Sequence, residues 1–124
     1  MDAFTEGDLR IDVDEVDDLV RLTWRGKSTA RNPSQLLHPY FQGILAGLSP
    51  TGAPPRTLHL AFEHLEHFNS ATISALIQLI HQCRALSAKL RITFDGRLKW
   101  QQLSFEALRA LAKSDGMFEV RSVT

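Results

Sequence analysis

The centre of the chain contains the stretch FEHLEHFNSATISAL, residues 62–76. Its first residue ends an alternating segment, residues 57–62, with the two-residue period of a strand that buries one face. A connector over residues 63–68 separates this strand from a second apolar pattern with helical spacing, over about residues 70–87. The members of that pattern are Ile73, Leu76, Ile77, Ile80 and Cys83. The stretch therefore predicts a strand, a short connector and a long helix.

Similar alternation marks the strands on either side of this centre. Segments around residues 9–13 and 20–25 alternate apolar and polar residues, and the acidic stretch between them suits a hairpin loop. Residues 89–94 and 118–123 predict two further strands. With the central strand, these segments make about five strands.

Two further helices are expected. Asn32 and Pro33 form a helix start signal, but Pro39 follows, and a proline inside a helix costs about 3 kcal/mol. We therefore expect a turn over residues 33–37 and the main helix over residues 39–46, before a proline- and glycine-rich loop. The last helix is expected over residues 104–113. Its cap is expected at Ser104, and its inner face at Phe105, Leu108, Leu111 and Ala112.

The resulting order is β-β-α-β-α-β-α-β, which indicates an α/β domain with parallel neighbours in its sheet. Strands covered on both faces are continuously apolar, whereas these alternate. The pattern therefore predicts a mixed sheet with the helices mainly on one face and one domain over residues 1–124. On the other face, His59, Arg91 and Thr93 form either a contact surface or an ordinary solvated face.

Charge and cysteine content narrow the class of function. The 14 basic and 14 acidic residues cancel, so nothing favours nucleic acid or an anionic membrane as a partner. A single cysteine, Cys83, excludes an internal disulfide. No signal sequence is visible and no apolar run approaches the ~20 residues of a membrane span, so we expect a cytoplasmic protein.

The start of the long helix is the main candidate site. Asn69 and Ser70 are ordinary helix caps, which is the simpler interpretation of their position. Hydroxyl groups at a helix start are also accessible, and the partial positive charge there tolerates a phosphate. Ser70 and Thr72 are the phosphorylation candidates, and Ser74 lies one turn further along.

This stretch resembles the signature of STAS domains, the family of bacterial anti-anti-sigma factors. In that signature a strand leads to Asp-Ser-Ser/Thr-Gly, which opens a helix. Here Asn69 stands at the Asp, Ser70 at the phosphorylated residue, Ala71 at the second hydroxyl residue and Thr72 at the glycine. The chain also resembles STAS-like regulatory phosphoproteins in which this glycine is not kept. The resemblance implies a STAS-like (SpoIIAA-like) fold.

The resemblance further implies a signalling protein that switches partners. The unmodified domain would bind a regulator such as an anti-sigma factor with serine kinase activity, phosphorylation would release it, and a PP2C-type phosphatase would restore binding. The partner-binding surface would include Asn69, Ser70, Thr72 and Ser74. The alternative is a STAS-like scaffold or homodimerisation module without phosphorylation.

A neighbouring cluster, Arg97, Lys99 and Trp100, combines basic and aromatic residues. Such a cluster can stack on bases, but in a neutral chain it fits a protein contact better, because Trp and Arg are enriched in interfaces. We assign it to the partner-binding surface. The alternative is that Trp100 is half-buried packing.

Metal binding and catalysis are the remaining alternatives. His64 and His67, with Glu63 and Glu66, lie in one connector, and His59 and His81 are further candidate ligands. His-x-x-His in a short connector without a second matched pair is only a weak signal for a metal site. Cys83 falls on the inner face of the long helix, which suits a core residue rather than a nucleophile. No phosphate-binding loop, dinucleotide motif or nucleophile elbow is present, so we expect a non-enzyme without cofactors.

Overall fold

The computed structural model describes residues 2–48, 54–111 and 116–123. Within them the chain forms three helices and seven strands, in the order β1 (Phe4–Glu6), β2 (Leu9–Val16), β3 (Leu19–Ser28), α1 (Pro33–Leu48), β4 (Thr57–Ala61), β5 (Leu65–Phe68), α2 (Ser70–Ala85), β6 (Leu90–Phe94), α3 (Lys99–Arg109) and β7 (Phe118–Ser122). The five expected strands are all present. β1 and β5 are additional short strands.

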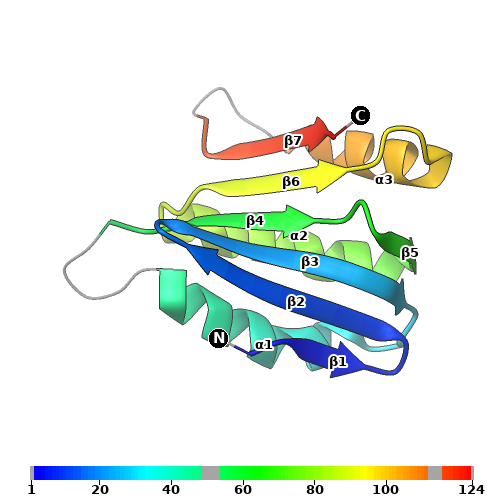
Figure 1. Cartoon of the computed structure of the whole chain (residues 1–124), viewed down its shortest axis with the longest axis horizontal. Coiled ribbons are helices and arrows are strands. Elements are labelled where there is room, and N and C mark those ends of the chain that lie inside the picture. Colours follow the sequence, from blue (N-terminus) through cyan, green and yellow to red (C-terminus); the bar gives the residue numbers. More distant parts are fainter. Residues whose placement is uncertain (1, 49–53, 112–115, 124) are drawn as a thin grey trace.

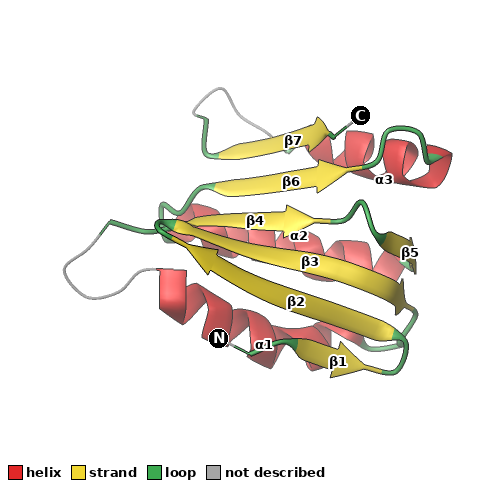
Figure 2. Ribbon diagram, in the orientation of Figure 1, coloured by secondary structure: helices red, strands yellow, loops and turns green. Residues whose placement is uncertain are grey.

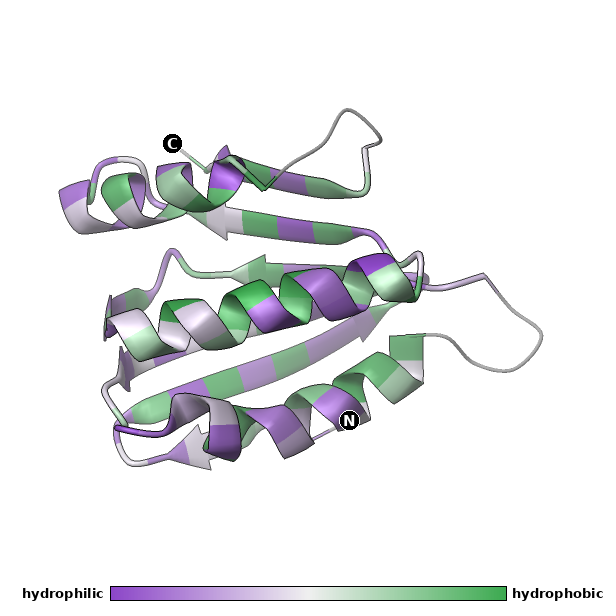
Figure 3. Ribbon diagram, turned by 180° about the vertical axis from the view of Figure 1, so that it is seen from behind, coloured by the Kyte–Doolittle hydropathy of each residue, from purple (hydrophilic) through white to green (hydrophobic). Residues whose placement is uncertain are grey.

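The strands form one mixed sheet with the spatial order β1-β2-β3-β4-β6-β7, and β5 pairs with the end of β3. β1, β2 and β3 are antiparallel neighbours, whereas β3, β4, β6 and β7 run parallel. Figures 1 and 2 show all three helices behind the sheet, and Figure 3 shows them from the other side. The prediction of a mixed sheet with helices on one face is confirmed.

The core lies between the sheet and the helices. Val20, Leu22 and Trp24 alternate along β3 and are fully buried, as the two-residue period predicts. The ring of Phe62 lies 4.9 Å from that of Trp24 and 4.8 Å from that of Phe105, which joins β3, the end of β4 and α3. Burial of each such side chain contributes about 1.5–3 kcal/mol, so this aromatic cluster holds α3 against the sheet.

β5 occupies part of the segment expected to be a plain connector. Leu65 pairs with Gly26 and Phe68 with Ser28, and both Leu65 and Phe68 are buried. Four residues are too few to show a strand pattern in the sequence. The strand forms because the long β3 offers it an unpaired edge.

The expected break at Pro39 is wrong, because α1 runs without interruption from Pro33 to Leu48. Pro33 is its first residue, where a missing N–H costs nothing. Pro39 lies on the exposed side and removes one backbone hydrogen bond. The opposite side buries Leu37, Phe41, Ile44, Leu45 and Leu48, and this packing outweighs the lost bond.

The expected start of the last helix is also wrong. α3 begins at Lys99, so Ser104 lies inside the helix and is not its cap. The cause is Gln101, whose fully buried side chain accepts from Asp95 N at 2.7 Å and donates to Phe62 O and Leu65 O at 2.7 and 3.0 Å. A glutamine on an inner face interrupts the apolar pattern. Of the expected inner residues, Phe105 and Leu108 are buried and Leu111 is half-buried beyond the end of α3, whereas Ala112 and the expected last residue, Lys113, lie outside the described residues.

The uncovered face of the sheet is polar but less accessible than expected. His59 and Thr93 are only 9% and 5% exposed. Arg21 Nε donates to His59 Nδ1 at 3.4 Å, so His59 Nε2 carries the proton and donates to Thr93 Oγ1 at 2.8 Å. The Thr93 hydroxyl in turn donates to Glu63 at 3.2 Å. These hydrogen bonds hold the two side chains against the sheet.

Candidate functional site at the start of α2

The N-termini of α1, α2 and α3 all lie at the end of the sheet where the parallel strands finish (Figure 1). Strand–helix–strand connections produce this arrangement, because each helix starts where a parallel strand ends. Binding sites in α/β proteins commonly occur at this edge. The sequence-predicted residues therefore meet at one end of the molecule.

Asn69 is the cap of α2, as one of the two sequence interpretations expects. Its backbone is extended, and its side-chain oxygen accepts from Thr72 N at 3.0 Å. The other side-chain atom, Nδ2, donates to Ala30 O at 2.9 Å, and the backbone N–H donates to Ser28 O at 3.0 Å. Asn69 thus joins the start of α2 to the chain that leaves β3.

Thr72 is fully buried, so the expectation of an accessible hydroxyl there is wrong. Its Oγ1 lies 2.8 Å from Asn69 Oδ1 and 2.7 Å from Ser28 Oγ. Because an amide oxygen only accepts, the Thr72 proton points to Asn69, and Ser28 must donate to Thr72. Thr72 therefore takes part in a buried hydrogen-bond network in which the donor and the acceptor of each bond are defined. The sequence did not identify Ser28, which lies 44 positions away.

Ser70, by contrast, is exposed and is the first residue of α2. Ser74 is exposed one turn further along the helix, and Ala71 is half-buried. The first turn of α2 carries no acidic residue, so the partial positive charge of the helix end is not offset there. Of the two phosphorylation candidates, only Ser70 presents its side chain to solvent.

The cluster at the start of α3 lies close to this helix start. The ring of Trp100 is half-buried, 5.3 Å from the ring of Phe68 and 6.1 Å from that of His67. Phe68 directly precedes Asn69, so Trp100 flanks the chain that leads into α2. This contact fits both sequence interpretations of Trp100, packing and interface.

The other members of this cluster differ in their surroundings. Arg97 is exposed, and its side chain contacts Asp95 with Nε–Oδ1 at 3.1 Å. Lys99 is exposed at the first position of α3. Two apolar residues that the sequence analysis did not select, Leu98 and Leu103, are 38% and 65% exposed beside them. The sequence did not show their exposure, because it depends on where α3 begins and which side it turns to the sheet.

The structure also places the residues of the alternative sites. Among the described residues, no group of three or more His, Cys, Asp or Glu side chains is arranged to hold a metal ion. Cys83 is 1% exposed, and burial raises the pKa of its thiol to about 12. The thiol therefore stays protonated at neutral pH and is a poor nucleophile. No helix in the described part of the chain is long and apolar enough to cross a membrane.

Comparison with solved structures decides the fold. An anti-sigma factor antagonist from Mycobacterium paratuberculosis superimposes with a TM-score of 0.65, over 91% of this chain and 85% of that chain, at 12% sequence identity. The chain has a SpoIIAA-like fold. A second match, an uncharacterized DUF3478-family protein with a SpoIIAA-like fold from Shewanella loihica PV-4, has a TM-score of 0.56 at 15% identity. It covers 94% of this chain and 90% of that chain.

These comparisons confirm the α/β SpoIIAA-like fold that the STAS resemblance implied, with its mixed sheet and three helices. No protein-family model and no curated protein matches the chain. At such low identities the likeness concerns the fold alone. The chemistry of the SpoIIAA-like domain must therefore be argued from its own residues.

Proposed function

We propose that this protein is a non-catalytic signalling module that binds a partner protein at the start of α2 and releases it when Ser70 is phosphorylated. The observation that carries the proposal is the contrast between two hydroxyls in one helical turn. Thr72 is sealed in the buried network with Asn69 and Ser28, whereas Ser70 faces solvent. The network holds the helix start in place, so Ser70 is presented on a rigid support.

The position of Ser70 suits a phosphate. A phosphoserine carries about −1.5 to −2 charges and three acceptor oxygens. At the first residue of a helix these oxygens meet unpaired backbone N–H groups and partial positive charge. Modification would therefore leave the fold intact and change only the surface. A partner surface matched to the unmodified hydroxyl would then be repelled or left with a desolvated charge.

The surroundings of Ser70 suit a protein contact. Trp100, next to Phe68, is a half-buried ring at the same end of the sheet. Leu98 and Leu103 add exposed apolar surface, and Lys99 adds a cation. Interface centres are enriched in Trp and depleted in charge, so Trp100 is the expected anchor of the partner.

The fold likeness to an anti-sigma factor antagonist supports the proposed class of partner. The proposed partners are an anti-sigma factor with serine kinase activity, which binds and modifies the domain, and a PP2C-type phosphatase, which reverses the modification. Both use cytoplasmic ATP or phosphoproteins, so the proposal places the domain in the cytoplasm. The domain itself needs no catalytic residue or cofactor for this role.

The test begins with the protein purified from cells of its own source. Peptide mass spectrometry is expected to find phosphate on Ser70, and Ser70→Ala is expected to abolish it. A partner recovered by affinity purification is then measured against purified variants by calorimetry. Ser70→Asp is expected to weaken binding at least about tenfold, or 1.4 kcal/mol. Gln78→Asp, which adds the same charge at an exposed position two turns along α2, should bind like the unmodified protein.

Two outcomes would contradict the switch. Phosphate found elsewhere while Ser70 stays unmodified would remove the site. Equal binding of the partner by Ser70→Asp and Gln78→Asp would show that charge at Ser70 does not control the contact. The second outcome would favour a SpoIIAA-like scaffold or homodimer without phosphorylation, which analytical ultracentrifugation of the unmodified chain would identify.

A further inference from the structure

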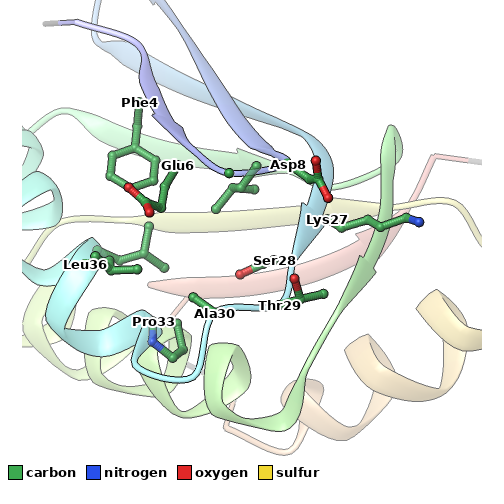
Figure 4. A pocket seen from close by; sticks show the side chains of 12 residues that line it. Phe4, Glu6, Asp8, Lys27, Ser28, Thr29, Ala30, Pro33 and Leu36 are labelled. Atoms are coloured by element: carbon green, nitrogen blue, oxygen red, sulfur yellow. The ribbon is translucent and has the colours of Figure 1, made fainter.

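A pocket of about 270 Å³ lies between the β1–β2 hairpin, the end of β3 and the first turns of α1. Phe4, Leu9, Leu36 and Leu37 supply apolar lining, and Ser28 lies among them with only 3% exposure. Figure 4 shows Phe4 and Leu36 at one end of the pocket, and the Ser28 oxygen points toward that end. The proposed partner switch does not use this pocket.

The wall formed by the hairpin is held by backbone geometry. Gly26 has φ of +82°, and a Cβ atom there would collide with the carbonyl oxygen of Asp8. The N–H of Lys27 donates to that same carbonyl at 3.1 Å. Only glycine allows the hairpin to approach β3 this closely. The pocket is therefore built between anchored elements.

The polar groups of the pocket are mainly acceptors. Glu6 and Asp8 both line it and are exposed, and within the described part of the chain no ion pair joins either carboxylate to a cation. Lys27 also lines the pocket, but its ammonium group extends away from the cavity in Figure 4. Figure 4 shows the carboxylate of Glu6 beside Phe4 and that of Asp8 on the opposite side of the pocket, so the two carboxylates flank the cavity.

The buried network adds a third acceptor. Asn69 Nδ2 donates to Ala30 O, so its side-chain oxygen accepts from Thr72, and the Ser28 proton must point to Thr72. The lone pairs of the Ser28 oxygen are then left for a donor in the pocket. Two carboxylates and an acceptor hydroxyl above an apolar lining match a ligand that carries N–H donors, positive charge and an apolar body.

We propose that this pocket binds a small apolar amine. The apolar body packs against Phe4, Leu9 and Leu37, and the ammonium group donates to Ser28 Oγ, where the flanking carboxylates of Glu6 and Asp8 attract its charge. The volume is just below the ~300 Å³ at which pockets for drug-sized ligands begin, so one ring with a short chain is the expected size.

Three probes of equal shape and different charge test this inference on the full chain. They are 3-phenylpropylamine, the neutral 3-phenylpropan-1-ol and the anionic 3-phenylpropionate, titrated and followed by ¹H–¹⁵N NMR. The amine is expected to bind about tenfold more tightly than the alcohol, and the carboxylate more weakly still. Shifts are expected at Leu9, Ser28 and Leu37, and also at the Thr72 amide, which the Ser28 hydrogen bond connects to the pocket.

Variants separate the charge contribution from damage to the fold. The double variant Glu6→Gln, Asp8→Asn is expected to lose most of the tenfold preference for the amine, with unchanged affinity for the alcohol. Glu66→Gln removes an exposed carboxylate at the same end of the sheet but outside the pocket, and should keep that preference. Equal affinities for the three probes, or shifts scattered away from the pocket, would overturn the inference. Because Ser70 lies outside the pocket, either result leaves the proposed switch to its own test.

Discussion

Ser28 Oγ and Thr72 Oγ1 lie 2.7 Å apart, although 44 positions separate them in the sequence. One ends β3 and the other lies in the first turn of α2, so this hydrogen bond joins the sheet to the helix that carries Ser70. Both side chains are buried, and a buried hydroxyl that loses its partner keeps its desolvation cost.

Thr72→Val keeps the shape of the side chain and removes its hydroxyl. Ser28 then lacks an acceptor and Asn69 Oδ1 loses one donor, so the free energy of unfolding should fall by about 1–3 kcal/mol in urea titrations. The matched change at the surface, Ser70→Ala, should alter it by less than about 0.5 kcal/mol. Equal effects of the two variants would mean that the buried network contributes nothing to stability.

Asn69 has two separable roles, which two substitutions distinguish. Asn69→Ala removes both the cap and the bond to Ala30 O, and should destabilise the protein by roughly 1–2 kcal/mol. Asn69→Asp keeps an acceptor for Thr72 N and places a negative charge at the helix start, which is favourable. It loses only the donor to Ala30, so its melting temperature should lie between those of the unmodified protein and Asn69→Ala. A melting temperature below that of Asn69→Ala would contradict this division.

Gln101 should be among the most sensitive polar positions. Its truncation in Gln101→Ala leaves the buried carbonyls of Phe62 and Leu65 and the N–H of Asp95 without this partner. We expect a loss of about 2–4 kcal/mol by chemical denaturation. Gln102→Ala, at the exposed neighbouring position, serves as the control and should change stability by less than about 0.5 kcal/mol.

His59 should make stability depend on pH. Burial is the main cause that lowers the pKa of His59, and the positive charges of Arg21 and Arg91 lower it further. Arg121 acts in the same direction, whereas Glu63 opposes the shift. The unfolded chain, with an ordinary histidine pKa of about 6.5, then binds the proton more readily than the folded chain. Stability is therefore complete above about pH 6.5 and falls as the pH drops from there through the folded-state pKa.

NMR titration of the imidazole and urea titrations across this pH range check the prediction. The pH dependence between about pH 6.5 and the folded-state pKa should be reduced in His59→Gln. Arg21→Gln should raise the pKa of His59, because it removes a neighbouring cation and a donor to Nδ1. Glu119, whose pKa is lowered by Arg121 and Arg91, titrates in a separate, more acidic window. An imidazole pKa at or above the ordinary value would refute the assignment.

Cys83 should be inert in the folded protein. Its thiol is buried and its pKa is raised to about 12, so little thiolate forms at neutral pH. Reaction with a disulfide reagent such as DTNB should be slow in buffer and become fast in denaturing urea. Fast labelling of the native protein would show that α2 opens readily from the sheet.

Much of the fold follows from patterns of short range. One such pattern is the alternation of Leu58, Leu60 and Phe62 along a strand, and another is the helical spacing of apolar residues from Ile73 to Cys83. Each pattern is recognised from residues two to four positions apart in the sequence. The cap at Asn69 is also local, because its partner Thr72 is three residues away. For the presence of these elements the sequence is sufficient, but the buried side of α2 is rotated from the expected one: Ile73 and Ile77 are only half-buried, and Thr72, Ala75 and Leu79 are buried beside Leu76, Ile80 and Cys83.

The sequence by itself determined the order of the three helices and the five longer strands, the mixed sheet and the position of the helix start that carries Ser70. Only the tertiary structure decided that Thr72 is enclosed by Ser28, that α3 begins ahead of Gln101, and that α1 continues through Pro39. The physical reason is the range of the interactions. Periodicity reports which side of an element is buried, whereas hydrogen bonds and packing between distant segments decide which individual side chains that burial covers.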